Sequence, residues 1–373
     1  MTPDTVAPEL VSDQLIINMG PQHPSTHGVL RVVLTVDGER IVDADPDIGY
    51  LHSSMEKIGE RKTWVQFLPY TDRFDYLSAI NNEFAYVRAV ERLLGIEVTE
   101  RCDHIRVIMA EMQRSVSHLM YFTAMGLDVG AITVYMYCFR DRERLIDLFE
   151  NTTGQRLLYH YFRIGGLRND LALDFVEGLR AFIEYFPAKL REYNNLLTDN
   201  RIFRGRMEGV AVLAPELAVR YGQSGPCLRA CGIAHDLRKT VGYSVYPQLE
   251  FDIPTYDTCD AVARHLVRCD EMVQSLRILE QALDKLPAGE VNVKMPRSIR
   301  PDPGAVYERV EGARGEVGCY VVSDGSEKPL RLKWRPPSYY NLQPLPELMR
   351  GGYVADGVVA IAALDIMLGD VDK

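Results

Sequence analysis

The stretch MGPQHPSTHGVLR, residues 19–31, organises the rest of this chain. Its two prolines exclude a regular helix, and a glycine near each end marks it as a turn. Apolar residues 15–19 precede it, and the β-branched residues 29–36 follow it. The pattern predicts two strands joined by a loop, which presents His23 and His27 from a rigid scaffold.

The residues alone leave three interpretations of His23 and His27 open. In the first, they belong to a polar loop and cap backbone groups. In the second, they bind a metal ion, although histidines four residues apart share one face only on a helix. In the third, a histidine donates a hydrogen bond into a buried ligand pocket.

Length and composition restrict the class of protein. A chain of 373 residues forms one large or two ordinary domains, and a hydrophobic content of 47% supports a sizeable core. The net charge of −10 and the absence of a Lys/Arg block argue against nucleic acid as a partner. No apolar run reaches the length of a membrane-spanning helix, and the start carries no signal segment. We therefore expect a water-soluble protein on the cytoplasmic side, or one peripheral on a membrane, with residues 1–13 as a loose tail.

The cysteines are scattered, odd in number and without a Cys-x-x-Cys pair. A disulfide framework is not expected, nor is a zinc or iron–sulfur site built from this chain alone. Each is instead expected to be a small buried hydrophobe. They are Cys102, Cys138, Cys227, Cys231, Cys259, Cys269 and Cys319.

Apolar residues at helical spacing predict a core of long antiparallel helices. One helix is expected to start at Asp72 as its N-cap and to end before Gly95, and the next starts near Thr99. Pro187 is expected to kink or break one of the later helices. The expected ranges are 55–62, 72–94, 99–125, 132–152, 171–197, 259–286 and 356–367.

Strand patterns lie at both ends of the chain. Short strands are expected at 305–310, 318–323 and 330–333, and they are predicted to join the N-terminal strands in one sheet. The fold class is therefore α+β. The expected organisation is an N-terminal tail and β segment with the histidine loop (1–50), a helical core (51–300), and a C-terminal β segment with a terminal helix that packs back on the core (301–373).

A set of motifs carries a family resemblance. They include GPQHPSTHGVLR (20–31), YTDRFDYLSA (70–79), SGPCLRACG (224–232) and LDIMLGDVDK (364–373), and they follow one another in order from residue 14 onward. The chain resembles the D-type (49-kDa) subunit of NADH:quinone oxidoreductase, respiratory complex I. That family has a fold similar to the large subunit of nickel–iron hydrogenases.

The similarity to hydrogenases shows where metal-binding cysteines would lie in this sequence. Hydrogenases hold their metal with two Cys-x-x-Cys pairs, at the start of a core helix and at the C-terminus. The matching stretches here read RFDY (73–76) and DIML (365–368), and neither contains cysteine. We therefore expect this chain to bind no metal and its cavity to accept an organic oxidant.

The resemblance implies roles for particular residues. His27 and Tyr76 match the family's ligands of the quinone headgroup and would act as catalytic proton donors, with His23 lining the substrate site. Asp128 matches the acid that pairs with the histidine and orients its ring. Without the resemblance, Tyr76 is typical of a core aromatic residue and Asp128 of a turn residue.

The resemblance also implies partners. Arg73 matches an arginine beside the terminal [4Fe–4S] cluster, which belongs to the neighbouring B-type subunit. The C-type subunit and the membrane subunit at the quinone channel are further expected partners, on the cytoplasmic face of the membrane. The whole complex is an enzyme that uses NAD, reduces ubiquinone or menaquinone and translocates protons, and this subunit is active only within it.

One departure and two alternatives remain. Many family members have a histidine where this chain has Leu158, and the nearest histidine is His160. A non-catalytic scaffold is one alternative, and a related subunit of a ferredoxin-linked or hydrogenase-type membrane complex is the other. The combination of His27 with Tyr76 in one cavity would argue against the scaffold, which needs neither, and the missing Cys-x-x-Cys pairs argue against a hydrogenase.

Overall fold

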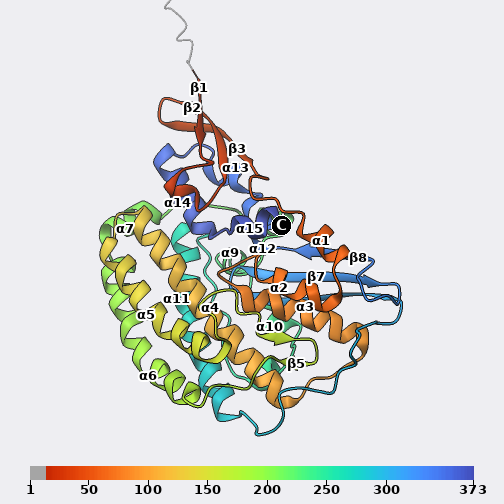
Figure 1. Cartoon of the computed structure of the whole chain (residues 1–373). Helices are drawn as coiled ribbons and strands as arrows, with labels where there is room; N and C mark the ends of the chain where they lie inside the picture. Colours follow the sequence, from red (N-terminus) through yellow and green to blue (C-terminus); the bar gives the residue numbers. More distant parts are fainter. Residues whose placement is uncertain (1–13) are drawn as a thin grey trace, which may run out of the picture.

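Long helices form the centre of the computed structural model, which describes residues 14–373 (Figure 1). The longest helix, α4, packs against α5, α11 and α3, and α6 packs on the outer side of α5. A connection of three residues makes α4 and α5 antiparallel. The bounds are α3 (Ala79–Leu94), α4 (Glu100–Asp128), α5 (Ile132–Thr153), α6 (Phe175–Tyr193) and α11 (Ala261–Asp284).

Local signals set several helix ends as predicted. The Thr99 hydroxyl accepts a hydrogen bond from the Cys102 N–H at 3.2 Å and caps α4. Gly95 ends α3 in the left-handed region, with φ of 64°. The sequence therefore specifies these two boundaries through single residues. Pro187, by contrast, lies inside α6 without ending it, so no break occurs there.

The predicted start of the helix at Asp72 is wrong. The chain instead forms α2 (Trp64–Thr71), an irregular turn over 72–78, and then α3. The Asp72 carboxylate is buried and accepts a hydrogen bond from the His160 N–H at 2.9 Å. Because this tertiary contact occupies the carboxylate, it does not cap a helix.

The β segments form two separate sheets, so the prediction of one shared sheet is wrong. The strands β1 (Leu15–Met19), β2 (Arg31–Asp37) and β3 (Arg40–Asp47) form one antiparallel sheet, which projects from one end of the molecule (Figure 1). A second antiparallel sheet packs beside α3 and α1 and contains β6 (Gly304–Gly312), β7 (Gly315–Ser323) and β8 (Arg331–Arg335). Each strand pairs with a neighbour in sequence, through tight hairpins for β2–β3 and β6–β7 and through longer loops for β1–β2 and β7–β8, and a bridge from Arg40 to Tyr353 covers an edge of the first sheet.

The remaining elements are short and connect these parts. The predicted C-terminal helix, 356–367, ends earlier than expected: α14 stops at Leu364, Asp365 lies in the left-handed region with φ of 53°, and a separate helix, α15, follows. The short helices are α1 (Met55–Arg61), α7 (Arg201–Met207), α8 (Pro215–Arg220), α9 (Pro226–Arg229), α10 (Leu237–Thr240), α12 (Pro337–Leu342), α13 (Leu345–Met349), α14 (Val354–Leu364) and α15 (Leu368–Asp372). The rest are η1 (Pro24–Thr26), η2 (Asn194–Thr198), η3 (Tyr246–Gln248), β4 (Phe162–Arg163) and β5 (Gly166–Leu167).

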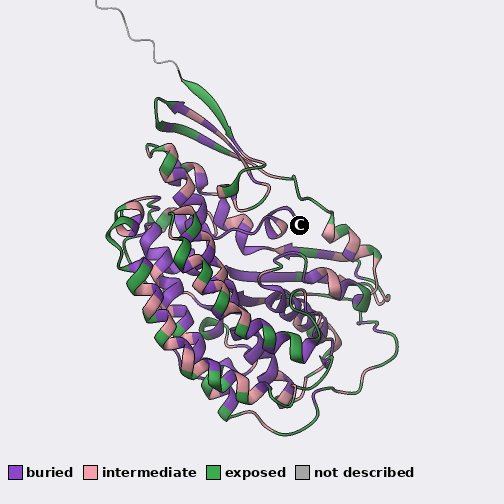
Figure 2. Ribbon diagram, turned by 60° about the vertical axis from the view of Figure 1, so that its left-hand side comes forward, coloured by how far each residue is buried: buried purple, intermediate pink, exposed green. Residues whose placement is uncertain are grey.

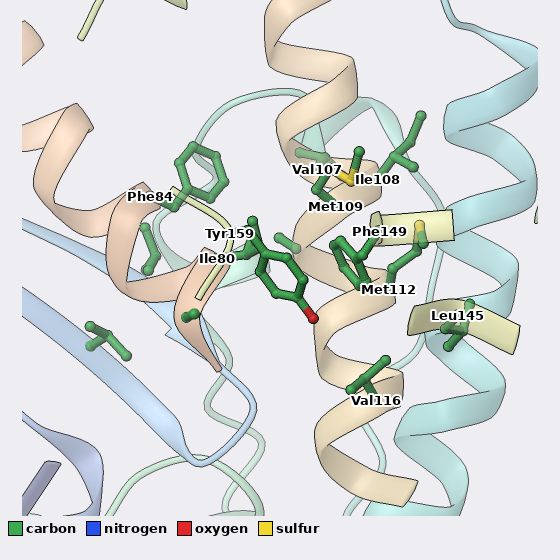
Figure 3. Packing of buried hydrophobic residues seen from close by; sticks show 14 of the residues in the cluster. Ile80, Phe84, Val107, Ile108, Met109, Met112, Val116, Leu145, Phe149 and Tyr159 are labelled. Carbon is green, nitrogen blue, oxygen red and sulfur yellow. The ribbon is translucent and has the colours of Figure 1, made fainter. Parts of the chain in front are cut away.

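The core is continuous from the helices to the second sheet (Figure 2). Apolar side chains of α3, α4 and α5 meet in it, among them Phe84, Met112 and Phe149 (Figure 3). The face of α4 with Arg106, Glu111 and Arg114 is also buried, and these charges pair inside the protein. Among residues 14–373, no helix is long and apolar enough to cross a membrane.

Candidate functional site

The histidine loop is held by its own hydrogen bonds. His23 Nδ1 accepts a hydrogen bond from the Ser25 N–H at 3.2 Å and caps the short helix η1. The buried Thr26 hydroxyl bonds the carbonyls of His23 and Gly28, at 2.9 and 2.8 Å. His27 ends η1 in the left-handed region, with φ of 53°. His23 therefore fits the first interpretation, in which a histidine of a polar loop caps backbone groups, and the residue is exposed.

His27 contacts Asp128, as the resemblance implied. Its Nε2 lies 2.6 Å from Asp128 Oδ2, and their side chains are only 15% and 7% exposed. Asp128 is the last residue of α4, where the helix dipole disfavours a negative charge. An imidazole proton compensates that carboxylate, so the helix end and the loop stabilise each other.

Tyr76 lies on the irregular turn between α2 and α3 and is 39% exposed. Burial, followed by the neighbouring Asp75 carboxylate, raises the pKa of the Tyr76 phenol. Asp75 is fixed in turn by Arg314, which donates to its Oδ2 at 2.7 Å. The phenol is therefore a proton donor that stays protonated near neutral pH.

The short helix α15 contacts both the histidine loop and the Tyr76 turn. A methyl group added at Gly28 would touch the Leu368 side chain, at 3.4 Å. A methyl group at Gly369 would lie 2.6 Å from the Phe74 carbonyl oxygen, so only glycine allows this approach. The loop and the turn are thus positioned against one element, although the residues of the two segments are about fifty positions apart.

Arg73 lies at the surface, on the same turn as Tyr76. Its guanidinium bonds the Pro69 carbonyl and lies 3.8 Å from Asp72. Next to it, His160 Nε2 lies 2.5 Å from an Arg163 nitrogen, and burial together with nearby arginines lowers the pKa of His160 to about 4. Leu158 is partly buried, with φ of 60°. This surface therefore combines fixed cations with a neutral imidazole.

Sequence reasoning missed a buried group of charges beneath Tyr76. Arg314 bonds both Asp75 and Asp365, and Asp370 lies on α15 beside them. The aspartates at 365 and 370 interrupt the apolar segment LDIMLGDVDK, which is the signal that could have found them.

The seven cysteines are all buried thiols, as expected of small hydrophobes. Over the described residues, 14–373, no three side chains of His, Cys, Asp or Glu lie close enough together to hold a metal ion. Within the charged run Arg140–Arg144, Asp141 is buried and accepts hydrogen bonds from Tyr185 and Tyr193.

Comparisons with known proteins give the family of this chain. The chain matches the family described as "Respiratory-chain NADH dehydrogenase, 49 Kd subunit" over residues 128–302 and 294–373. It is 47% identical to the subunit named D 2 of the NADH-quinone oxidoreductase of Symbiobacterium thermophilum, over 97% of this chain and 99% of that protein. It is 46% identical to the subunits named D of the corresponding oxidoreductases of Desulforamulus reducens, over 97% and 99%, and Geobacillus thermodenitrificans, over 97% and 100%.

These matches first define a class, the subunits of respiratory-chain oxidoreductases. Within that class, the chain belongs to the family of the 49 Kd subunit of the respiratory-chain NADH dehydrogenase. The resemblance seen in the sequence and the α+β class are thereby confirmed.

Proposed function

We propose that this chain binds the quinone headgroup of the NADH:quinone oxidoreductase complex and supplies the protons for its reduction. The observation that carries the proposal is the 2.6 Å contact between His27 and Asp128. Reduction of a quinone to a quinol consumes two electrons and two protons, one proton at each carbonyl oxygen. His27 and Tyr76 are the two donors, and both belong to segments that pack on α15.

His27 would deliver its proton through Nδ1. Its Nε2 is occupied by the Asp128 carboxylate, which stabilises the charged imidazolium and keeps the ring oriented. When Nδ1 gives its proton to a quinone oxygen, the ring becomes neutral and its Nε2–H stays on Asp128. The carboxylate thus lowers the cost of charging the ring without itself leaving the ionised state.

Tyr76 would protonate the other quinone oxygen. Its raised pKa keeps the phenol neutral until electrons make that oxygen basic. The electrons come from a [4Fe–4S] cluster of the B-type subunit, which this chain does not hold. The exposed guanidinium of Arg73 suits a position beside that cluster, where a fixed cation favours the reduced state.

Further partners follow from the same proposal. The C-type subunit and the membrane subunit at the quinone channel would pack around this chain, which would lie peripherally on the cytoplasmic face of the membrane. His23 would line the substrate site through its position in the loop, since its Nδ1 already caps η1.

The test uses the assembled complex with Tyr76→Phe and His27→Ala variants. We expect each to lower quinone reduction by NADH about 100-fold, while NADH oxidation by an artificial acceptor upstream of the site stays unchanged. Tyr320→Phe is the matched control, because Tyr320 is 38% exposed and lies on β7. If Tyr76→Phe behaved like this control, the chain would be a scaffold and the proposal would fail.

A further inference from the structure

Asp370 is a buried carboxyl group that the proposed reaction does not use. It lies on α15, is fully buried, and accepts one hydrogen bond, from the Ser338 N–H to Oδ2 at 3.0 Å. Its other oxygen, Oδ1, is buried and has no hydrogen-bond partner among the described residues. Burial in this position is costly for a charged carboxylate and much less costly for a neutral, protonated carboxyl group.

The charges around Asp370 do not balance if every carboxyl group is ionised. Three buried carboxyls, Asp75, Asp365 and Asp370, come from the turn before α3, the end of α14 and α15. Against them stand two guanidiniums: Arg314 donates to Asp75 at 2.7 Å and to Asp365 at 3.2 Å, and Arg268 Nε lies 3.7 Å from Asp365. One proton on the three carboxyls makes the group neutral, which a buried cluster favours.

The other charged residues of α15 face different partners. Asp372 accepts hydrogen bonds from the backbone N–H groups of Gly49 and Leu51, and Lys373 donates to the Trp334 carbonyl. Ser338, from α12, adds no charge. Among the charged groups, Asp75 and Arg314 are therefore the ones that act on Asp370.

Burial, together with the Asp75 carboxylate, raises the pKa of Asp370 to about 7. The same Asp75 carboxylate also raises the pKa of the Tyr76 phenol. Asp75 therefore acts on both the Asp370 carboxyl group and the Tyr76 phenol. The backbone of α15 also contacts the backbone of the Tyr76 turn, where Gly369 meets the Phe74 carbonyl.

We propose that Asp370 stores the proton that restores Tyr76 after the tyrosine has protonated its substrate. This proposal rests on the proposed function of Tyr76. In the first step the phenol O–H bond breaks and the substrate O–H bond forms. In the second, the O–H bond of Asp370 breaks and the phenol O–H bond forms again, which leaves an Asp370 carboxylate beside Arg314. A proton from solvent then reloads Asp370. Asp370 acts through Tyr76 and is a positioning residue.

The test compares Asp370→Asn with wild type in the assembled complex. Asparagine keeps an oxygen for the Ser338 N–H but has no acidic proton. We expect quinone reduction to fall about 10-fold below pH 7, where wild-type Asp370 carries its proton, and to approach the wild-type rate above pH 7, where the wild-type carboxyl group has also lost it, with an unchanged KM for quinone. Asp370→Glu should restore the wild-type pH profile, because it restores a carboxyl group. Asp260→Asn is the matched control, since Asp260 is also buried and caps α11, a role that asparagine fills as well.

A spectroscopic measurement separates a proton store from a structural role. The difference infrared spectrum between oxidised and reduced complex should contain a band of a protonated carboxyl group that disappears in Asp370→Asn and persists in Asp260→Asn. A wild-type pH profile in Asp370→Asn, or an unchanged band, would overturn the inference. If Tyr76→Phe left quinone reduction intact, the proposed function of Tyr76 would be wrong. If Tyr76→Phe lowered it and Asp370→Asn did not change the pH profile, only the inference about Asp370 would be wrong.

Discussion

Two of the regions with paired charges differ in how many partners each charge has. At the histidine loop, one contact joins His27 to Asp128, and both side chains are partly exposed. Between α4 and α11, Glu271 accepts hydrogen bonds from Arg229 and His118, each at 2.8 Å, and Arg229 also donates to Glu311 at 2.8 Å. These last four side chains are at most 1% exposed.

The difference separates scaffold from site. A charge with several buried partners cannot change its protonation without leaving others unpaired, so the network around Arg229 fixes one arrangement of helices. The single contact between His27 and Asp128 involves no further charged partner among residues 14–373.

Arg229→Ala should destabilise the fold most. It leaves Glu271 and Glu311 buried without their shared cation, which costs about 3–5 kcal/mol. We expect little of the variant chain in purified complex and fast hydrogen exchange of amides in α4 and α11. Arg277→Ala is the control, because its pair with Asp252 is exposed and contributes at most about 1 kcal/mol. Equal yields for the two variants would contradict a scaffold role for the network.

The pH dependence of stability should reveal the protonated carboxyl beneath Tyr76. Because the pKa of Asp370 is raised to about 7 in the folded chain, the folded state holds a proton between about pH 4 and pH 7 that the unfolded state has released. The free energy of unfolding therefore falls as pH rises through this window, by up to roughly 4 kcal/mol. Thermal unfolding of the complex at several pH values measures this slope.

Asp370→Asn should reduce that slope. It should not abolish it, because burial raises the pKa of Asp72 to about 6 and adds a contribution of the same sign. Asp260→Asn should leave the slope as in wild type. A wild-type slope in Asp370→Asn would mean that this carboxyl is not the one that carries the proton.

The two regions also differ in how far the sequence predicts them. The histidine loop follows from nearby residues, because prolines and glycines restrict the backbone and strand patterns flank it. The Thr99 cap and the Gly95 helix end were predictable for the same reason. The partner of His27 was not local, since 101 positions separate it from Asp128, and only the family resemblance indicated it.

The buried network could not be predicted from spacing. Arg106, Glu111 and Arg114 lie at intervals typical of a solvated helix face, yet their partners come from distant segments such as Arg238, 127 positions from Glu111. The same limit explains the error about the sheets. Strand patterns at both chain ends were compatible with one sheet, and only the hairpin partners and the contact of β3 with Tyr353 decide for two.

Asp128→Asn should affect activity while leaving the fold intact. Asparagine still accepts a hydrogen bond from His27 but supplies no negative charge to stabilise the imidazolium, so quinone reduction should fall about 10- to 100-fold. NADH oxidation by an artificial acceptor should stay unchanged. Asp284→Asn is the control, because Asp284 also ends a long helix and is 59% exposed. Equal loss of both activities in Asp128→Asn would indicate failed assembly instead.

His23→Ala should have the smallest effect. The residue is exposed and its Nδ1 caps a helix of only three residues, so the loss of that hydrogen bond costs about 0.5–1 kcal/mol and loosens the loop slightly. We expect quinone reduction to change by less than about threefold, and His23→Asn to restore it, because asparagine also caps helices. A large loss in both variants would show that the imidazole itself contacts the quinone. In that case both histidines of the loop would bind substrate, and His23 would do more than shape the loop that presents His27.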